Sequence, residues 1–132
     1  MKLVPFHLDH LARITPQDAQ KGADLSGEWI SGPAWTAIDG EAVAAIGGFL
    51  LQWDGRFLAW AVIGAGANMR ALTRIVREKV DAFQVRRIEA TIDVGFRQAI
   101  KWAKMLGFEF EGVLRCAGLN GEDFAMYSKV VR

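Results

Sequence analysis

Apolar positions in the middle of the chain change their spacing twice, and these changes mark the elements that we predict there. The run 56–63 is almost unbroken apolar, as a strand covered on both faces should be. Small residues follow at 64–68, and from Met69 onward the apolar residues recur at helical spacing. The apolar face of this helix consists of Met69, Leu72, Ile75, Val76, Val80 and Phe83. Because 87–92 reads as the next strand, the pattern predicts a parallel, right-handed crossover.

The N-terminal segment carries weaker signals. Residues 2–8 are mostly apolar and predict an edge strand, because Pro5 cannot donate a hydrogen bond to a ladder. Thr15 suits a helix N-cap and Pro16 the first helical position. We therefore expect a helix from there to about Leu25.

Two Asp-Gly pairs predict hairpin turns. The pair 39–40 closes a brief strand at 35–38, and the pair 54–55 follows a longer strand at 42–53. Gly47-Gly48 within the longer strand indicates a bulge or a bend. Three antiparallel strands therefore lead into the parallel unit.

A second apolar stripe at helical spacing follows Asp93, and Gly107 is a suitable C-terminal stop for this helix. The stripe consists of Phe96, Ala99, Ile100, Ala103 and Leu106. Strands at 108–114 and 124–131 complete the chain. The order β-α-β-β-β-α-β-α-β-β predicts one α/β domain, residues 1–132, with a sheet of mixed strand directions.

Composition excludes several function classes. The 132 residues are 52% hydrophobic and 23% charged, with a formal net charge of +1. This charge balance gives no general electrostatic attraction to nucleic acid or to a membrane. A single cysteine, Cys116, cannot form an internal disulfide and suits a reducing compartment. Two histidines and one cysteine supply no metal-ligand spacing, so we predict no metal. We expect a soluble, cytoplasmic protein.

The element order, together with the segment 99–108 (AIKWAKMLGF), resembles the GNAT superfamily of acyl-CoA N-acyltransferases. The resemblance covers nearly the whole chain. It implies a GNAT-like α/β (α+β) fold, with a mixed, mostly antiparallel sheet, a central splayed parallel β-α-β unit and helices on both faces. The strands matching 57–63 and 87–92 would splay apart, and acyl-CoA, most simply acetyl-CoA, would fill the gap as co-substrate.

The resemblance also implies how the donor is held. Backbone N–H groups of 64–69 would bind the pyrophosphate, with attraction from the helix dipole, and N–H groups near Ala61 to Ile63 would polarise the thioester carbonyl. An amine of a small molecule or protein would attack directly, with no covalent intermediate. The expected cofactor-binding residues are Ala61, Val62, Ile63, Gly64, Ala65, Gly66, Ala67, Asn68, Met69 and Arg70.

Departures from the family pattern define an alternative. The loop is shorter than usual, Phe96 stands where an Asn commonly begins the second helix, and Ala103 stands where a Tyr often serves as acid. The sole tyrosine, Tyr127, falls on the last strand. With Ala-Ile-Gly-Gly at 45–48, these features resemble phage-encoded GNAT-like proteins with a degenerate acetyl-CoA loop. The alternative is a non-catalytic virion, assembly or interaction protein, with phage structural proteins or a second copy of the chain as partner.

An amine must lose a proton to attack a thioester, so a general base is needed. The acidic candidates are Glu28, Asp39, Glu41, Glu89 and Asp93. Glu89 ranks first because it interrupts an apolar strand, where a carboxylate facing the cleft would have a raised pKa. Glu28 ranks second, in a loop that borders the acceptor site in the family.

Overall fold

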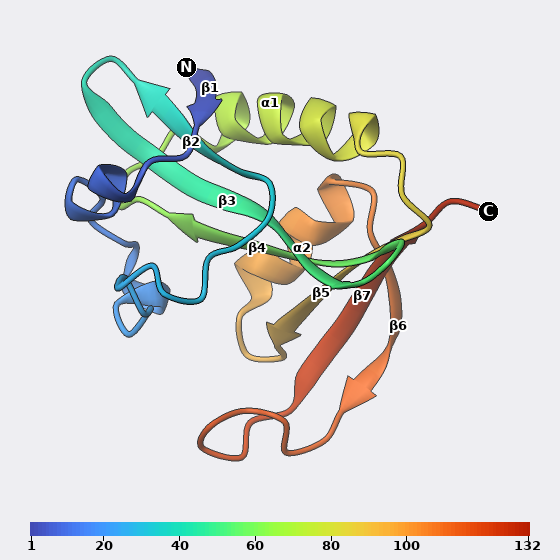
Figure 1. The fold of residues 1–132 in the computed structure, drawn as a ribbon. Helices are drawn as coiled ribbons and strands as arrows, with labels where there is room; N and C mark the ends of the chain where they lie inside the picture. The colour runs from blue at the N-terminus through green and yellow to red at the C-terminus, as the bar shows by residue number, and fades with distance from the viewer.

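Seven strands pair into one mixed sheet in the computed structural model, which describes residues 1–132 (Figure 1). The sheet order is β1-β2-β3-β4-β5-β7-β6, and every neighbouring pair is antiparallel except β4 with β5. The strands are β1 (Lys2–Pro5), β2 (Ala34–Asp39), β3 (Ala42–Trp53), β4 (Arg56–Ile63), β5 (Arg87–Asp93), β6 (Glu109–Leu114) and β7 (Phe124–Val130). The α-helices are α1 (Met69–Ala82) and α2 (Arg97–Met105), and two 3-10 helices, η1 (Leu8–Ala12) and η2 (Asp18–Gln20), precede β2.

The central strands β4 and β5 separate soon after they begin. Only three residue pairs join them, namely Arg56 with Arg87, Phe57 with Ile88 and Leu58 with Glu89. Beyond these pairs the two strands fan apart (Figure 1). The splayed parallel unit that the resemblance implied is therefore present.

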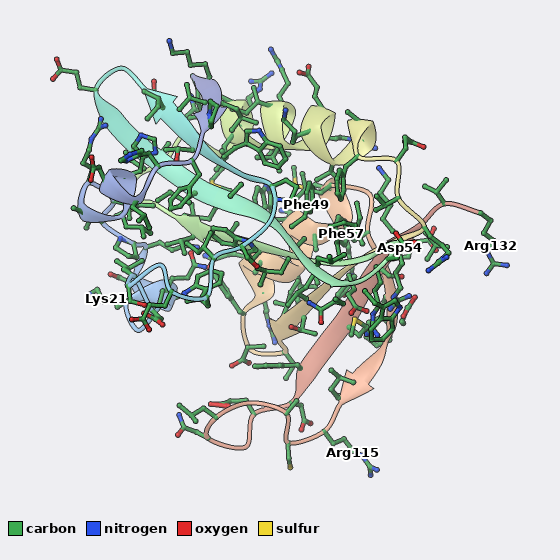
Figure 2. The ribbon with its side chains drawn as sticks, in the orientation of Figure 1. Lys21, Phe49, Asp54, Phe57, Arg115 and Arg132 are labelled. Carbon is green, nitrogen blue, oxygen red and sulfur yellow. The ribbon has the colours of Figure 1, made fainter.

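Three phenylalanines pack beside the end where β4 and β5 still pair. The ring of Phe83, at the end of α1, stacks on Phe49 at a centroid distance of 4.3 Å and meets Phe57 edge-on at 4.9 Å. Phe49 and Phe57 lie close together on β3 and β4 (Figure 2). This aromatic cluster closes one end of the splay, so the opening lies toward the carboxyl ends of the strands.

Both α-helices lie on one face of the sheet, and η1 with the loop after it covers the other. On the first face, Val80 of α1 and Leu106 after α2 share one core cluster with Ile88 of β5. On the second face, Leu11 of η1 packs with Ile46 of β3 in a separate cluster. The expected helices on both faces are thus α-helices on one side and 3-10 helices on the other.

The helix expected from Thr15 to about Leu25 was wrong. Residues 15–17 instead run extended along the end of β4, where Pro16 forms a bridge with Gly64. The Gln17 amide donates to the Ile63 carbonyl at 2.8 Å. Pairing with a free strand edge satisfies these backbone groups, and only the single turn η2 follows.

Gly47-Gly48 does not form a bulge, which was one of the two features expected of the pair, the other being a bend. Both residues keep the regular register of β3 with β2 and β4, and the irregularities lie elsewhere, between Ala37 and Ile38 and between Leu51 and Trp53. The pair instead permits close approach. A Cβ on Gly48 would lie 2.4 Å from the Pro33 carbonyl oxygen, too close for any side chain.

The end of α2 follows from the Leu-Gly-Phe sequence. Gly107 has a φ of +92°, and its amide donates to Lys104 while the Phe108 amide donates to the Ala103 carbonyl at 3.0 Å. This is a Schellman arrangement, which needs a left-handed residue at that position. Phe108 is buried and anchors the turn in the core. None of the helices in the structure is long and apolar enough to cross a membrane.

Candidate functional site

A cavity of about 570 Å³ lies where β4 and β5 separate. Its walls are mostly apolar and come from both splayed strands, from α1 and α2, and from the segment around η2. Trp60, Met69 and Phe96 are among the lining residues. These large side chains therefore form walls of the cavity and do not fill it.

Free backbone N–H groups gather at the start of α1, beside this cavity. The amides of Gly66, Asn68, Met69 and Arg70 have no acceptor in the protein, whereas Gly64 donates to Ala44 at 2.7 Å. Asn68 caps the helix, since its Oδ1 accepts a hydrogen bond from the Ala71 amide at 3.2 Å. The N-terminus of a 14-residue helix with unpaired N–H groups attracts anions.

Part of the expected pyrophosphate loop is already committed to internal bonds. The Ala65 amide donates to the Thr15 carbonyl at 2.7 Å, and the Ala67 amide to the Gly64 carbonyl at 3.2 Å. The group of amides open to a ligand therefore begins at Gly66, where φ is +74° and a Cβ would meet no atom within 4 Å.

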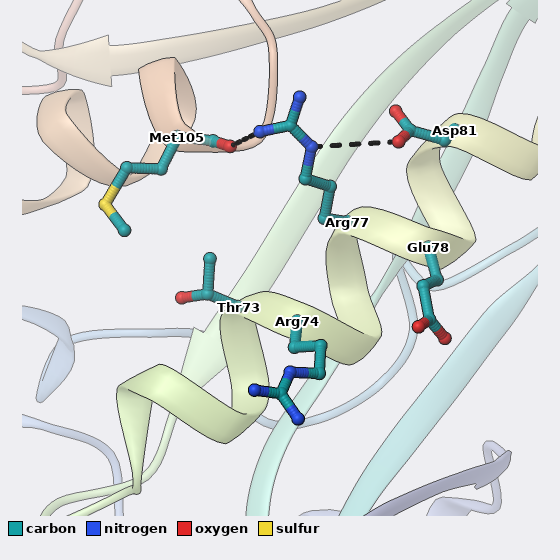
Figure 3. Close-up of a pocket in the computed structure, with 6 residues that line it drawn as sticks. All are labelled: Thr73, Arg74, Arg77, Glu78, Asp81 and Met105. Carbon is teal, nitrogen blue, oxygen red and sulfur yellow. Dashed lines mark hydrogen bonds and ion pairs between the residues drawn. The ribbon is translucent and has the colours of Figure 1, made fainter.

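The three arginines of α1 divide into two kinds. Arg77 belongs to the packing of the helices, because its Nη1 donates to the Met105 carbonyl at 2.7 Å and its Nε lies 3.7 Å from Asp81 (Figure 3). Arg74 and Arg77 line one surface pocket between α1 and the end of α2 (Figure 3). Neither Arg74 nor Arg70 forms an ion pair. Arg70 is the arginine next to the free amides.

The edge of β4 that was expected to hold the thioester carbonyl has an internal partner. The Ile63 amide donates to Oε1 of Gln20 at 2.8 Å, and Nε2 of Gln20 donates to the Ala61 carbonyl at 2.8 Å. Sequence reasoning missed Gln20, because a glutamine in a polar turn carries no signal for a contact with two residues that lie 41 and 43 positions further along the chain.

Glu89 lies at the closed end of the splay and is absent from the cavity lining. Its carboxylate is 4% exposed and pairs with Arg56 at 2.6 Å and with Arg87 at 2.9 Å. Glu89 was ranked first as general base because its carboxylate was expected to face the cleft. In the structure this carboxylate does not line the cavity and pairs with two guanidinium groups instead.

Glu28 is exposed and also lies outside the cavity lining. Its neighbour Trp29 packs edge-on against Trp60 of β4, with ring centroids 4.6 Å apart. The loop of Glu28 thus sits against the face of β4 opposite the α-helices. The structure does not bring Glu28 and Glu89 together.

Asp93 is the one carboxylate that lines the cavity. It ends β5, is half-buried, and its Oδ1 accepts a hydrogen bond from the Gly95 amide at 2.8 Å. The signal for it was present in the sequence, as an Asp-x-Gly turn at the carboxyl end of a parallel strand. Tyr127 is buried in the main core cluster and does not line the cavity.

No protein-family model and no curated protein sequence matches the chain. Solved structures do resemble it. A GNAT superfamily phosphinothricin acetyltransferase from Sinorhizobium meliloti, in complex with acetyl-CoA, superposes with a TM-score of 0.72 and 18% identity, over 98% of this chain and 88% of the other.

Two further acetyltransferases superpose equally well. For an N-acetyltransferase from Staphylococcus aureus the TM-score is 0.74 at 15% identity, over 99% of this chain and 98% of the other. For a spermidine N-acetyltransferase variant from Vibrio cholerae it is 0.73 at 12% identity, over 98% and 92%. The chain therefore has the fold of the GNAT-superfamily acetyltransferases.

Proposed function

We propose that the chain is an acyl-CoA-dependent N-acyltransferase that moves an acetyl group from acetyl-CoA to an amine. The observation that carries the proposal is the separation of β4 from β5 after Leu58 and Glu89, with an apolar cavity in the gap. A cavity of this size suits an acyl group with part of its carrier, and the free amides at the start of α1 suit the attached phosphates.

In this proposal the donor is held mainly by backbone groups. The pyrophosphate lies on the amides of Gly66, Asn68, Met69 and Arg70, and the Arg70 side chain adds positive charge. The thioester end enters the apolar cavity, where exclusion of water protects it from hydrolysis. Amide N–H groups on the separated part of β4 polarise the carbonyl once the donor replaces the side chain of Gln20, which accepts from the Ile63 amide in the free protein.

Acetyl transfer then needs only one base. The amine nitrogen attacks the thioester carbonyl carbon, the carbon–sulfur bond breaks, and CoA leaves as a thiolate. We assign the proton of the attacking amine to Asp93, directly or through a water, because it is the carboxylate in the cavity wall. Glu28 stays the second candidate from the sequence. Glu89 is not retained as the base, since both its oxygens pair with arginines.

A small-molecule amine is the acceptor that we infer. The similar structures carry the names of a spermidine and a phosphinothricin acetyltransferase, and both names denote small amines. The cavity of this chain is apolar apart from Asp93, Lys79, Thr91 and three glutamines, which leaves one carboxylate to attract an ammonium group.

A non-catalytic GNAT-like protein, acting in phage assembly or as an interaction scaffold, is the second candidate. The observation that favours it is the internal bonding of the site, where the amides of Ile63, Gly64 and Ala65 all have partners in the chain. Fewer backbone donors are then open to acetyl-CoA than the resemblance implied.

Release of the CoA thiol, measured with purified protein, acetyl-CoA and a panel of amines, tests the proposal. The panel contains spermidine, phosphinothricin and a lysine peptide, and mass spectrometry identifies the acetylated product. The proposal expects transfer to one member of the panel, and a lowering of kcat by roughly 100-fold or more in Asp93→Asn. Asparagine keeps the Oδ1 that accepts from Gly95, so the change removes the base but not the turn.

Asp39→Asn, in the exposed β2–β3 turn, is the matched control and should transfer at the wild-type rate. Equal kcat values for the two variants would contradict the role of Asp93. Binding of acetyl-CoA without transfer to any amine would favour the second candidate.

A further inference from the structure

The separated edge of β4 is paired with the N-terminal segment of the chain, in the place where β5 would otherwise continue the sheet. Past Leu58 the ladder to β5 ends, and residues 15–17 run antiparallel to 63–65. The segment that leads into η2 lies beside the arrowhead of β4 (Figure 1). The Ile63 carbonyl and the Ala65 amide at this edge therefore have partners in residues 15–17, although β5 does not continue along it.

Gln20 completes this edge with its side chain. Its carboxamide donates to the Ala61 carbonyl and accepts from the Ile63 amide, each at 2.8 Å. Ala61 and Ile63 present these groups to the same edge, so one primary amide fills the place that a peptide group of a neighbouring strand would fill. Nε2 of Gln17 donates to the same Oε1 at 3.0 Å and fixes the orientation of the amide.

The carboxamide of Gln20 also borders the cavity. Gln17 and Gln20 both line it, together with Ala61 and Ile63, whose backbone groups they bind. The arm of CoA that leads to the thioester contains two amides of its own, and each offers one donor and one acceptor. A donor that enters along β4 would form the two hydrogen bonds that Gln20 forms in its absence.

We propose that Gln20 is a displaceable occupant of the acyl-donor site, and that its two hydrogen bonds to β4 set the affinity for the donor. The inference rests on the proposed function. When the donor binds, an amide of the ligand replaces the amide of Gln20 on β4. The two hydrogen bonds of Gln20 must break, and their free energy is subtracted from the free energy of donor binding. Loss of this carboxamide removes the competitor and leaves the Ala61 carbonyl and the Ile63 amide open.

The test is isothermal titration of acetyl-CoA into the wild-type protein and into Gln20→Ala. The inference expects Gln20→Ala to bind about ten-fold more tightly, since two hydrogen bonds of ordinary net strength are no longer displaced. Gln84→Ala is the matched control. It also removes a glutamine amide bonded to a backbone carbonyl, that of Asp81, but at the far end of α1, and its affinity should equal that of the wild type.

Gln20→Glu is a second variant that keeps the test possible if Gln20→Ala does not fold. It keeps the length of the side chain and an acceptor for the Ile63 amide, but its carboxylate cannot donate to Ala61, so it should also bind more tightly than the wild type. Thermal unfolding of each variant confirms that it is folded before titration.

The outcomes separate the two claims. Equal or weaker binding by the folded Gln20 variants overturns this inference and leaves the proposed function standing. Tighter binding by the Gln20 variants than by a wild type that also binds supports both claims. Absence of binding by all four proteins overturns the proposed function, and this inference with it.

Discussion

Nη2 of Arg56 lies 2.6 Å from Oε1 of Glu89, and this ion pair stands where β4 and β5 make their last contacts before they separate. Arg87 approaches the other carboxylate oxygen at 2.9 Å. Arg56 in turn lies over the ring of Trp53, 4.1 Å from its centroid. The closed end of the splay is therefore held by a buried carboxylate between two guanidinium groups.

Glu89→Gln is expected to destabilise the fold without a specific effect on catalysis. The change leaves Arg56 without its partner carboxylate in a largely buried setting, which costs about 2–4 kcal/mol of the free energy of unfolding. Urea denaturation measures this loss. Acetyl transfer per folded molecule should equal that of the wild type.

Glu28→Gln is the control for Glu89→Gln, because Glu28 is exposed and forms no ion pair. Its free energy of unfolding should change by less than about 0.5 kcal/mol. A Glu89→Gln protein that is fully stable yet inactive would restore Glu89 as the catalytic candidate and contradict this account.

Gly66→Leu is expected to weaken acetyl-CoA binding by more than about ten-fold while the protein stays folded. A Cβ at this position meets no atom within 4 Å, but the φ of +74° strains a leucine by about 1–2 kcal/mol. The bulky side chain would stand beside the free amides of Gly66, Asn68 and Met69. Titration calorimetry of the variant measures the loss.

Gly121→Leu separates strain from the loss of the site. Gly121 has a φ of +82° and also meets no atom within 4 Å, but it lies in the connection between β6 and β7. Both variants should unfold at similarly lowered temperatures, and only Gly66→Leu should lose affinity. An equal loss of affinity in the two variants would argue against the loop as the phosphate site.

Stability should fall in acid through Glu111. Hydrogen bonds from Arg87 and then from Ser128 lower the pKa of Glu111 from 4.5 to about 2. A carboxyl group with a depressed pKa contributes stability that is complete above pH 4.5 and is lost as the pH falls toward 2. Because the side chain is 38% exposed, solvent screening reduces the contribution to about 1 kcal/mol.

Denaturation of Glu111→Gln across this pH range isolates that contribution. The variant should be less stable than the wild type by about 1 kcal/mol at pH 6, and the difference should vanish as the pH approaches 2. Glu109→Gln, on the same strand but without an ion pair, should follow the wild type at every pH. A constant difference between Glu111→Gln and the wild type would show that the bonds do not depend on ionisation.

Most of the fold could be predicted because local patterns dominate it. The apolar run of β4 and the helical spacing from Met69 give the correct bounds for β4 and the start of α1. Gly107 stops α2 as expected, through its left-handed conformation. The failure at 15–25 has the opposite cause, since Thr15 and Pro16 favour a helix locally but pair with the free edge of β4 in the structure.

The candidate site was harder to predict, because its properties depend on partners distant in sequence. The bend 64–68 was identified, but its free amides could not be separated from those bonded to Ala44 and Thr15. Glu89 was selected because it is a charged residue in an apolar strand. Its charge is neutralised by two arginines, Arg87 on the same strand and Arg56 on the neighbouring strand. Asp93 was one of five acidic candidates until the splay placed it in the cavity wall.

Titration of the wild-type protein with acetyl-CoA, with CoA as the control, tests the central claim that the gap between β4 and β5 is an acyl-donor site. The account predicts a Kd in the micromolar range for the wild type, and a Kd more than about ten-fold higher for Gly66→Leu. No detectable heat at millimolar acetyl-CoA, with the wild type and with Gln20→Ala alike, would contradict it. The GNAT fold would then serve this chain without the cofactor.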